Sequence, residues 1–207
     1  MSKVSPEARI LTRAYFNRPA LRVARSLLGK YLVRGIDTGL LAGRIVEVEA
    51  YVGPQDLACH ASKGRTKRTD VLFGPPGVAY VYLIYGMYYC FNVVTDRAGY
   101  PAAVLVRAIE VYENPAQTGS KPAESQPVLI DGPGRLCRFL QIDLSLNRWD
   151  LSVGQTLWIE DRGERLRSAE IVATPRIGVD YAGEWATKLY RFRIQRTVSR
   201  RSSRSPQ

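Results

Sequence analysis

The sequence predicts a single α/β domain dominated by antiparallel strands, with helices near its start and in its middle. The chain has 207 residues and 45% hydrophobic content, enough to bury one core. Short alternating apolar segments recur between glycine- and proline-containing turns, which is typical of strands. The sequence shows no internal repeat and no interdomain linker. We therefore expect one domain over residues 1–197 and a basic, disordered tail over residues 198–207.

The clearest helix signals lie in the first thirty residues. Ser5-Pro6-Glu7 is typical of an N-cap with proline in the first turn, so we expect a short helical lead over the first fifteen residues. A firmer helix begins near Pro19, because apolar residues recur at helical spacing up to Gly29, a residue suited to ending a helix. Strands over residues 30–33 and 40–52 follow.

The remaining elements are mostly strands and turns. Gly74-Pro75-Pro76-Gly77 indicates a rigid turn, the stretch 113–127 is rich in proline, serine and glycine and indicates a mobile loop, and Asp131-Gly132-Pro133-Gly134 opens a short helix. We expect further strands over residues 78–94, 102–109, 155–160, 169–173 and 190–195.

Composition restricts the possible functions. The net charge is +11, which favours a polyanionic partner, with nucleic acid first and an anionic membrane second. No apolar run approaches the roughly 20 residues of a membrane helix, and no secretory leader is visible. The three cysteines lack CxxC spacing, which indicates a reducing cytosol. The single histidine, His60, excludes sites built from several histidines, and we expect no metal.

The strand over residues 43–52 is the most informative run. Because side chains alternate faces along a strand, Val46, Val48, Ala50 and Val52 share one apolar face, and Ile45, Glu47, Glu49 and Tyr51 share the other. Two carboxylates beside an aromatic ring indicate the wall of a site, although a solvated outer face explains the same pattern. His60 then precedes a basic loop, and rings beside phosphate-binding charge are what nucleobase stacking requires. A surface histidine and a solvated loop remain the alternative.

The segment 78–94 is too long for one strand and predicts a hairpin whose tip is Tyr85-Gly86. An aromatic ring at a rigid tip suits a wedge between base steps, or the ring packs on a neighbouring loop. Tyr82 belongs either to the core or to the cavity that Tyr51 faces. Asn92 either satisfies backbone groups or reads a base edge.

Two further features carry charge or free backbone amides. Arg107 lies within an otherwise apolar strand, and a buried arginine needs a carboxylate, for which Glu47 and Glu49 are the candidates. This pair is either part of a site or purely structural. The start of the helix at Gly134 and Arg135 either presents amides to a phosphate or is an ordinary capped helix.

The chain resembles the alkyladenine (3-methyladenine) DNA glycosylase family from about Phe16 to Phe192. Motifs in matching order carry the resemblance: Gly43 to Tyr51, His60, Tyr80 to Tyr88, Leu105 to Ala108, Asp131 to Cys137, Arg176 to Val179 and Ala182 to Ala186. It implies a mixed α+β single domain with a curved, mainly antiparallel sheet, a protruding β-hairpin and peripheral helices. It also implies excision of alkylated purines, and often of deaminated or etheno adducts, from duplex DNA.

The resemblance also implies roles for individual residues. Glu49 activates water as general base, and Arg107 holds the water and the carboxylate. The flipped base is sandwiched by Tyr51, His60 and Tyr82, and Asn92 lines the pocket and disfavours normal guanine. Tyr85 fills the gap that the base leaves in the duplex. We take Lys63, Arg65, Lys67, Arg68, Gly134 and Arg135 as candidates for contacts to the DNA backbone. The loop after His60 departs from the family pattern, since it reads Lys67-Arg68-Thr69 where some relatives carry Thr-Pro-Arg-Asn.

Physical chemistry agrees with such an enzyme. Arginine beside Glu49 is expected to keep the carboxylate ionised at neutral pH. A glycosylase that also cuts the strand needs an amine nucleophile, and none of the six lysines lies in the strand and hairpin that carry the site. We therefore expect a monofunctional enzyme without AP-lyase activity and without a cofactor, acting as a monomer on double-stranded DNA with damaged purines in a bacterial cytoplasm. The alternatives are a non-catalytic nucleic-acid-binding module and, with less support, a membrane-surface protein.

Overall fold

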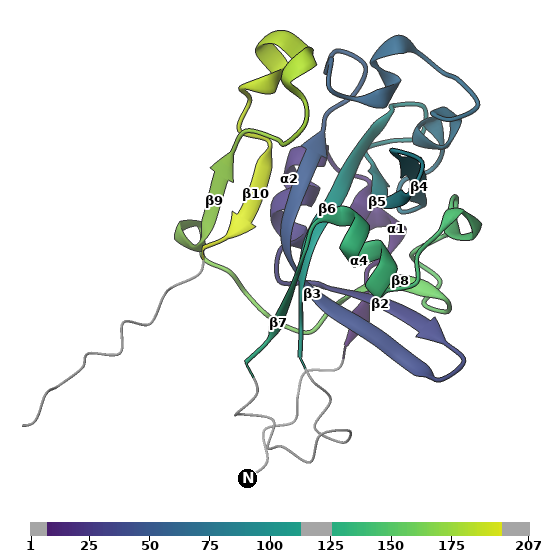
Figure 1. The fold of residues 1–207 in the computed structure, drawn as a ribbon, viewed down its shortest axis with the longest axis vertical. Coiled ribbons are helices and arrows are strands. Elements are labelled where there is room, and N and C mark those ends of the chain that lie inside the picture. Colours follow the sequence, from purple (N-terminus) through teal and green to yellow (C-terminus); the bar gives the residue numbers. More distant parts are fainter. Residues whose placement is uncertain (1–7, 113–125, 196–207) are drawn as a thin grey trace, which may run out of the picture.

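The computed structural model describes residues 8–112 and 126–195. Within them the chain forms a mixed α+β domain around one ten-stranded sheet in which every strand pairing is antiparallel (Figure 1). This confirms the expected fold class. The basic tail and the loop expected over 113–127 lie outside the described residues, apart from the two residues 126 and 127.

Ten strands make up the sheet. Their bounds are β1 Arg9–Ile10, β2 Tyr31–Ile36, β3 Gly39–Tyr51, β4 Ala79–Ile84, β5 Tyr88–Thr95, β6 Ala102–Val111, β7 Val128–Asp131, β8 Leu157–Asp161, β9 Ile171–Thr174 and β10 Arg191–Ile194. The main path runs β1-β8-β2-β3-β6-β5-β4, while β10 pairs with β3 and β9, and β7 pairs with β6. The central strand β3 therefore has β6 on one side and first β2, then β10, on the other.

The helices are short. They comprise α1 Arg13–Phe16, α2 Ala20–Leu27, α4 Pro133–Phe139 and the 3-10 helices η1 His60–Lys63, η2 Asp70–Phe73, η3 Leu144–Leu146, η4 Ser168–Glu170 and η5 Asp180–Ala186. The predicted start near Pro19 is confirmed by α2, and Gly29 has a positive φ of 79° just beyond its end. The helical lead expected over the first fifteen residues is confirmed at Arg13 to Tyr15, which belong to α1, and is wrong at Arg9 and Ile10, which pair with β8 as a strand.

The main core contains buried residues of α2, α4 and the sheet strands. The helix α2 packs on β3 and β6, and α4 packs on β5, β6 and β7. Figure 1 shows that the segment following β3 (blue) and the loop between β9 and β10 (yellow-green) gather at the same end of the sheet. This end is where the C-terminal half of β3 carries its polar residues.

Two β-bulges interrupt the pairing of β3 with β6. Ile45 is opposite Ile109 and Glu47 is opposite Ala108, so Val46 is the extra residue on β3; the next pair, Val48 with Val106, leaves Arg107 as the extra residue on β6. The expected strict alternation is therefore wrong before Glu47. Ile45 belongs to the main core, and Val46 lies on the wall of a separate cavity.

We expect Gly43→Ala to destabilise the fold by about 1–3 kcal/mol, because added volume in a packed core forces its neighbours to shift. A Cβ at Gly43 would lie 2.5 Å from Cδ1 and 2.8 Å from Cβ of the fully buried Ile109. Urea unfolding measures the change. Ile109→Val removes the nearest atom, so the double variant should lose less stability than the two single changes added together. Full additivity would show that the contact at Ile109 is not the cause.

Candidate active site

Glu49 lies in the middle of the sheet and is fully shielded from water. Its neighbours in the strand register are Leu105 on β6 and Arg191 on β10. The adjacent residues Val48 and Ala50 are also fully buried, so both faces of β3 are covered at this point. Glu49 was expected on the wall of a site or on a solvated outer face; the solvated face is excluded, because the segment between β9 and β10 covers Glu49.

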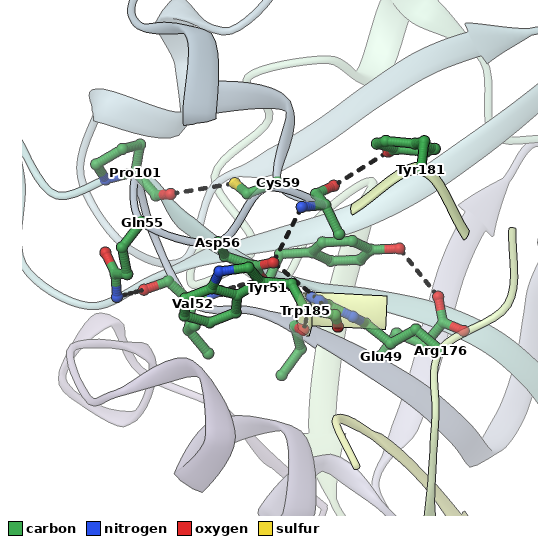
Figure 2. Close-up of polar contacts among 12 residues, drawn as sticks. Glu49, Tyr51, Val52, Gln55, Asp56, Cys59, Pro101, Arg176, Tyr181 and Trp185 are labelled. Atoms are coloured by element: carbon green, nitrogen blue, oxygen red, sulfur yellow. Dashed lines mark hydrogen bonds and ion pairs between the residues drawn. The ribbon is translucent and has the colours of Figure 1, made fainter. Parts of the chain in front are cut away.

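Three groups hold the Glu49 carboxylate (Figure 2 shows Tyr51 among them). One oxygen, Oε1, accepts a hydrogen bond of 2.8 Å from the backbone amide of Ile177. The other, Oε2, accepts one of 3.0 Å from the Tyr51 hydroxyl and lies 3.3 Å from Nη1 of Arg107. The register bulge at Arg107 gives this side chain its own direction away from the regular ladder.

The pKa of Glu49 is shifted in the opposite direction to the one that its arginine neighbour alone would cause. Burial raises the pKa of Glu49 above its ordinary value, while the Arg107 guanidinium, the Ile177 amide and the Tyr51 hydroxyl partly oppose this. The prediction considered the arginine and left out the covering segment, whose desolvation effect is the larger one. A carboxylate with a raised pKa is a stronger proton acceptor than an ordinary one.

A cavity of about 340 Å³ lies beside the groups that hold this carboxylate, and Glu49 itself is not among the residues that line it. Arg107, Tyr51 and Ile177, which hold Glu49, all line it. The other expected pocket residues line it as well: His60, Tyr82 and Asn92. The structure thus brings Arg107 and the residues proposed for the base pocket to one cavity, and Glu49 reaches this cavity only through the groups that hold it. The volume falls within the range of small-ligand sites.

The aromatic wall is built around His60. Its ring contacts Tyr82 edge to face, with centroids 4.6 Å apart, and its Nδ1 lies 2.9 Å from the Tyr80 hydroxyl. Burial, assisted by the charge of Arg68, lowers the pKa of His60 to about 4. The ring is therefore neutral at physiological pH. Of the two interpretations of Tyr82, the cavity wall is the one observed.

Asn92 is buried on β5 and satisfies a backbone group, which is one of the two roles that the sequence left open. Its side-chain amide donates a hydrogen bond of 3.2 Å to the Tyr80 carbonyl, and the residue lines the cavity. The bond fixes the amide group, so its orientation in the cavity is set by the β4–β5 pairing, in which Asn92 is opposite Tyr80.

The expected hairpin tip is confirmed at Tyr85-Gly86. The strands β4 and β5 pair up to Ile84 and Tyr88, and Tyr85 and Gly86 both have positive φ, 52° and 70°. Positive φ at both positions matches the twist of hairpin turns, although a bulky residue seldom adopts it. The Tyr85 side chain lines the cavity mouth yet remains 82% exposed, so it does not pack on a neighbouring loop.

The candidates for contacts to the DNA backbone lie at two places. Lys63, Arg65, Lys67 and Arg68 are all exposed. Arg65 pairs with Asp70 at 2.6 Å, and the Arg68 guanidinium lies 5.0 Å from the centre of the Tyr82 ring. At the start of α4, Arg135 is exposed and Gly134 faces the Tyr88 ring so closely that a Cβ would be 3.0 Å from it. The close packing gives Gly134 a structural reason to be glycine.

Sequence reasoning missed a buried ion pair beside the site. Arg176 and Asp56 are both fully buried side chains, joined by hydrogen bonds of 2.5 and 2.8 Å. Arg176 also donates to the Ala50 carbonyl at 2.9 Å, and its guanidinium lies 4.8 Å from the centre of the Tyr51 ring. It is adjacent to Ile177, whose amide holds Glu49, so the pair anchors the segment that covers the carboxylate.

Tyr181 is a second residue that the sequence did not single out. It lines the cavity and is 70% exposed, on η5 across from the hairpin. The only signal for it, and for Arg176, was their place within or beside the motifs of the family resemblance. Among the described residues, no group of three or more His, Cys, Asp or Glu side chains is placed to hold a metal ion. No described helix has the length and apolarity needed to cross a membrane.

Comparisons with known proteins agree with this geometry. Residues 14–198 match the family model described as methylpurine-DNA glycosylase. The chain belongs to the methylpurine-DNA glycosylase family. A relative from Methanocella arvoryzae is 52% identical over 185 residues, covering 88% of this chain and 91% of the relative. Relatives from Myxococcus xanthus and Legionella pneumophila (strain Corby) are 50% and 48% identical, covering 89% and 90% of this chain and 90% and 95% of theirs. All three are named for 3-methyladenine DNA glycosylase.

Membership of the methylpurine-DNA glycosylase family confirms the resemblance drawn from the motifs. It makes the chain a DNA glycosylase, a hydrolase that acts on DNA in repair. Family membership favours an enzyme over the non-catalytic binding module considered above. DNA is a polyanion, so a substrate of this kind accounts for the net charge of +11.

We expect the imidazole of this glycosylase to titrate with a midpoint near 4, well below the ordinary value of about 6.5. Because His60 is the only histidine, NMR follows it without ambiguity. The folded pKa is lower than the unfolded one, so this group's contribution to stability is complete above about pH 6.5 and is lost as the pH falls through 4. Arg68→Gln removes the positive charge that helps burial to lower the pKa of His60, so it should raise the midpoint. A wild-type midpoint near 6.5 would contradict the buried position of the ring.

Proposed function

We propose that this glycosylase releases alkylated purines from duplex DNA, with Glu49 as the general base that activates water. The observation that carries the proposal is a fully buried carboxylate held by three groups that all line one aromatic cavity. A base within the duplex hides its glycosidic bond, so the nucleotide must be turned out of the helix into such a cavity. Released 3-methyladenine is the product that the names of the relatives suggest.

The cavity wall favours a cationic purine. Alkylation at a ring nitrogen places a positive charge on the base and makes it a better leaving group. Aromatic faces attract cations, and Tyr51, His60 and Tyr82 supply three rings. In the proposed reaction the base lies among these rings, Asn92 disfavours normal guanine, and the sugar carbon faces Glu49. Arg107 holds the carboxylate and the water, and the negative charge stabilises the developing oxocarbenium ion. Deaminated and etheno purines are further candidate substrates.

The hairpin supplies the Tyr85 ring, which fills the position in the duplex that the flipped base leaves. Tyr85 is 82% exposed at the tip of a paired β-hairpin and lies at the mouth of the cavity. Unstacking a base step costs a few kcal/mol, and a ring inserted into the gap offsets part of this cost. The exposed basic residues of the loop that follows the cavity residue His60 are candidates to contact phosphates while the Tyr85 ring is inserted.

We also propose that the enzyme leaves the DNA backbone intact. Cutting at the abasic site by β-elimination begins with an amine that forms a Schiff base with the sugar. None of the described residues that line the cavity is a lysine. The nearest lysines in sequence, Lys63 and Lys67, are exposed in the loop that follows His60. Water is then the nucleophile, and the product is an abasic site.

We expect Glu49→Gln to lower the single-turnover rate of base release by about 10²–10⁴, the usual contribution of general acid–base catalysis, while binding of the lesion is retained. The assay uses a duplex with one alkylated purine and identifies the released base by mass spectrometry. Each reaction is divided, and one half is treated with alkali before the strands are separated.

Glu184→Gln is the matched control, because Glu184 is exposed and lines neither the aromatic cavity nor the separate cavity at Val46. It should release the base at the wild-type rate. Wild-type release by Glu49→Gln would remove Glu49 from the mechanism. Strand breaks in the half without alkali would contradict the monofunctional reaction.

We expect Tyr85→Ser to weaken binding of the lesion duplex by about tenfold or more, since stacking on a ring contributes about 1–3 kcal/mol per base. Affinity for undamaged duplex should change much less. Fluorescence anisotropy with matched lesion and undamaged duplexes measures both. Tyr112→Ser serves as control, because Tyr112 is 46% exposed but lines neither cavity. Equal discrimination by Tyr85→Ser and wild type would refute the wedge role.

A further inference from the structure

Arg107 connects the candidate base to a second carboxylate. Its Nε donates a hydrogen bond of 3.1 Å to Oε1 of Glu47, while its Nη1 lies 3.3 Å from Oε2 of Glu49. The two acidic side chains therefore share one guanidinium. Glu49 is 0% exposed and Glu47 is 15% exposed. Only Glu49 is isolated from water, so the two carboxylates have different environments although they are two residues apart.

Glu47 has a second cationic partner. Nη1 of Arg191, on β10, lies 3.4 Å from Oε1 of Glu47, and Nε of Arg191 donates to the Thr174 hydroxyl at 2.8 Å. Arg191 is opposite Glu49 in the β10–β3 register. Arg107 and Arg191 thus approach Glu47 from the strands on the two sides of β3, and both are less than one-fifth exposed.

Glu47 also lines a second and larger cavity. This cavity has a volume of about 700 Å³ and shares no described lining residue with the aromatic cavity. Glu47 lines the larger cavity and Arg107 lines the aromatic one, so the ion pair between them connects the two. Glu47 is 15% exposed, and its carboxylate is paired with both Arg107 and Arg191. Its negative charge then acts on Glu49 at short range, where little solvent screens it.

We propose that Glu47 is a positioning residue that aims Arg107 at Glu49 and sets the pH range over which Glu49 is available as base. The proposal rests on the proposed function of Glu49. Arg191 moderates the effect, because its positive charge lies beside Glu47 and next to Glu49 in the sheet. No group of the substrate needs to contact Glu47 for this role.

The sign of the effect follows from the charges around Glu49. Tyr51, Arg107 and the Ile177 amide contact it, and the Arg176 guanidinium and the Cys90 thiol act on it electrostatically. Glu47 shares Arg107 with it, and Arg191 is opposite it in the β10–β3 register. A like charge disfavours ionisation and an opposite charge favours it. Glu47→Gln removes a like charge, so Glu49 stays ionised to lower pH. Arg191→Gln removes an opposite charge, so Glu49 becomes protonated at higher pH.

The experiment measures single-turnover release of 7-methylguanine from a duplex as a function of pH. This lesion carries a fixed positive charge, so its departure needs no protonation and the acid limb of the profile reports the base alone. We expect the limb to move to lower pH in Glu47→Gln and to higher pH in Arg191→Gln. One pH unit below the wild-type midpoint, Glu47→Gln should retain about threefold more of its plateau rate than wild type does, because the midpoint of its acid limb lies at lower pH.

Two further variants separate positioning from a merely structural role. Glu47→Asp keeps the charge and should leave the limb close to that of wild type. Glu164→Gln alters a carboxylate that lines the same cavity but pairs with Arg44, and it should move nothing. Limbs that stay at the wild-type midpoint in both Glu47→Gln and Arg191→Gln, with only the plateau lowered, would overturn the proposal. No release by the wild-type protein would instead contradict the proposed function, so the two failures are distinguishable.

Discussion

The candidate active site of this glycosylase depends on keeping one carboxylate out of water. An isolated buried carboxylate costs several kcal/mol in desolvation, so it persists only where other groups compensate for the lost water. Glu49 receives this compensation from three separate parts of the chain: Tyr51 on its own strand, Arg107 on β6 and the backbone amide of Ile177. Because the three meet only when the sheet is paired and the covering segment is in place, the chemistry of the site is a property of the complete fold.

The covering segment is in turn held by a second buried charge pair. Arg176 bonds to Asp56, the Ala50 carbonyl and the Trp185 carbonyl, so it ties together the turn after β3, the strand itself and η5 (Figure 2). Removing one member of such a pair leaves the other charge buried and alone, which is far more costly than losing an exposed pair. The pair therefore fixes the Ile177 amide before any substrate binds, and pre-set donors lose less energy in the reaction than mobile ones.

Local sequence patterns predicted much of this site, and long-range contacts decided the rest. Period-two alternation placed Glu49 and Tyr51 on one side of a strand, where their side chains are hydrogen-bonded. The need of a buried arginine for carboxylates identified both partners of Arg107. The bulges at Val46 and Arg107 were not predictable, because one extra residue leaves no mark on composition. The raised pKa of Glu49 was missed because it depends on a segment more than 120 residues away.

The electrostatics of the cavity explain how a cationic lesion is distinguished from a neutral base in the proposed reaction. Burial raises the pKa of the Tyr51 and Tyr82 hydroxyls and lowers that of His60, so all three rings stay uncharged at physiological pH. Glu49 lies behind the wall and Arg107 forms part of it, and their opposite charges largely cancel at a distance. A cation is therefore attracted by ring faces, an interaction that depends on stacking geometry. An unpaired carboxylate would hold any cation, whereas ring faces give an additional stacking contact to a flat cation.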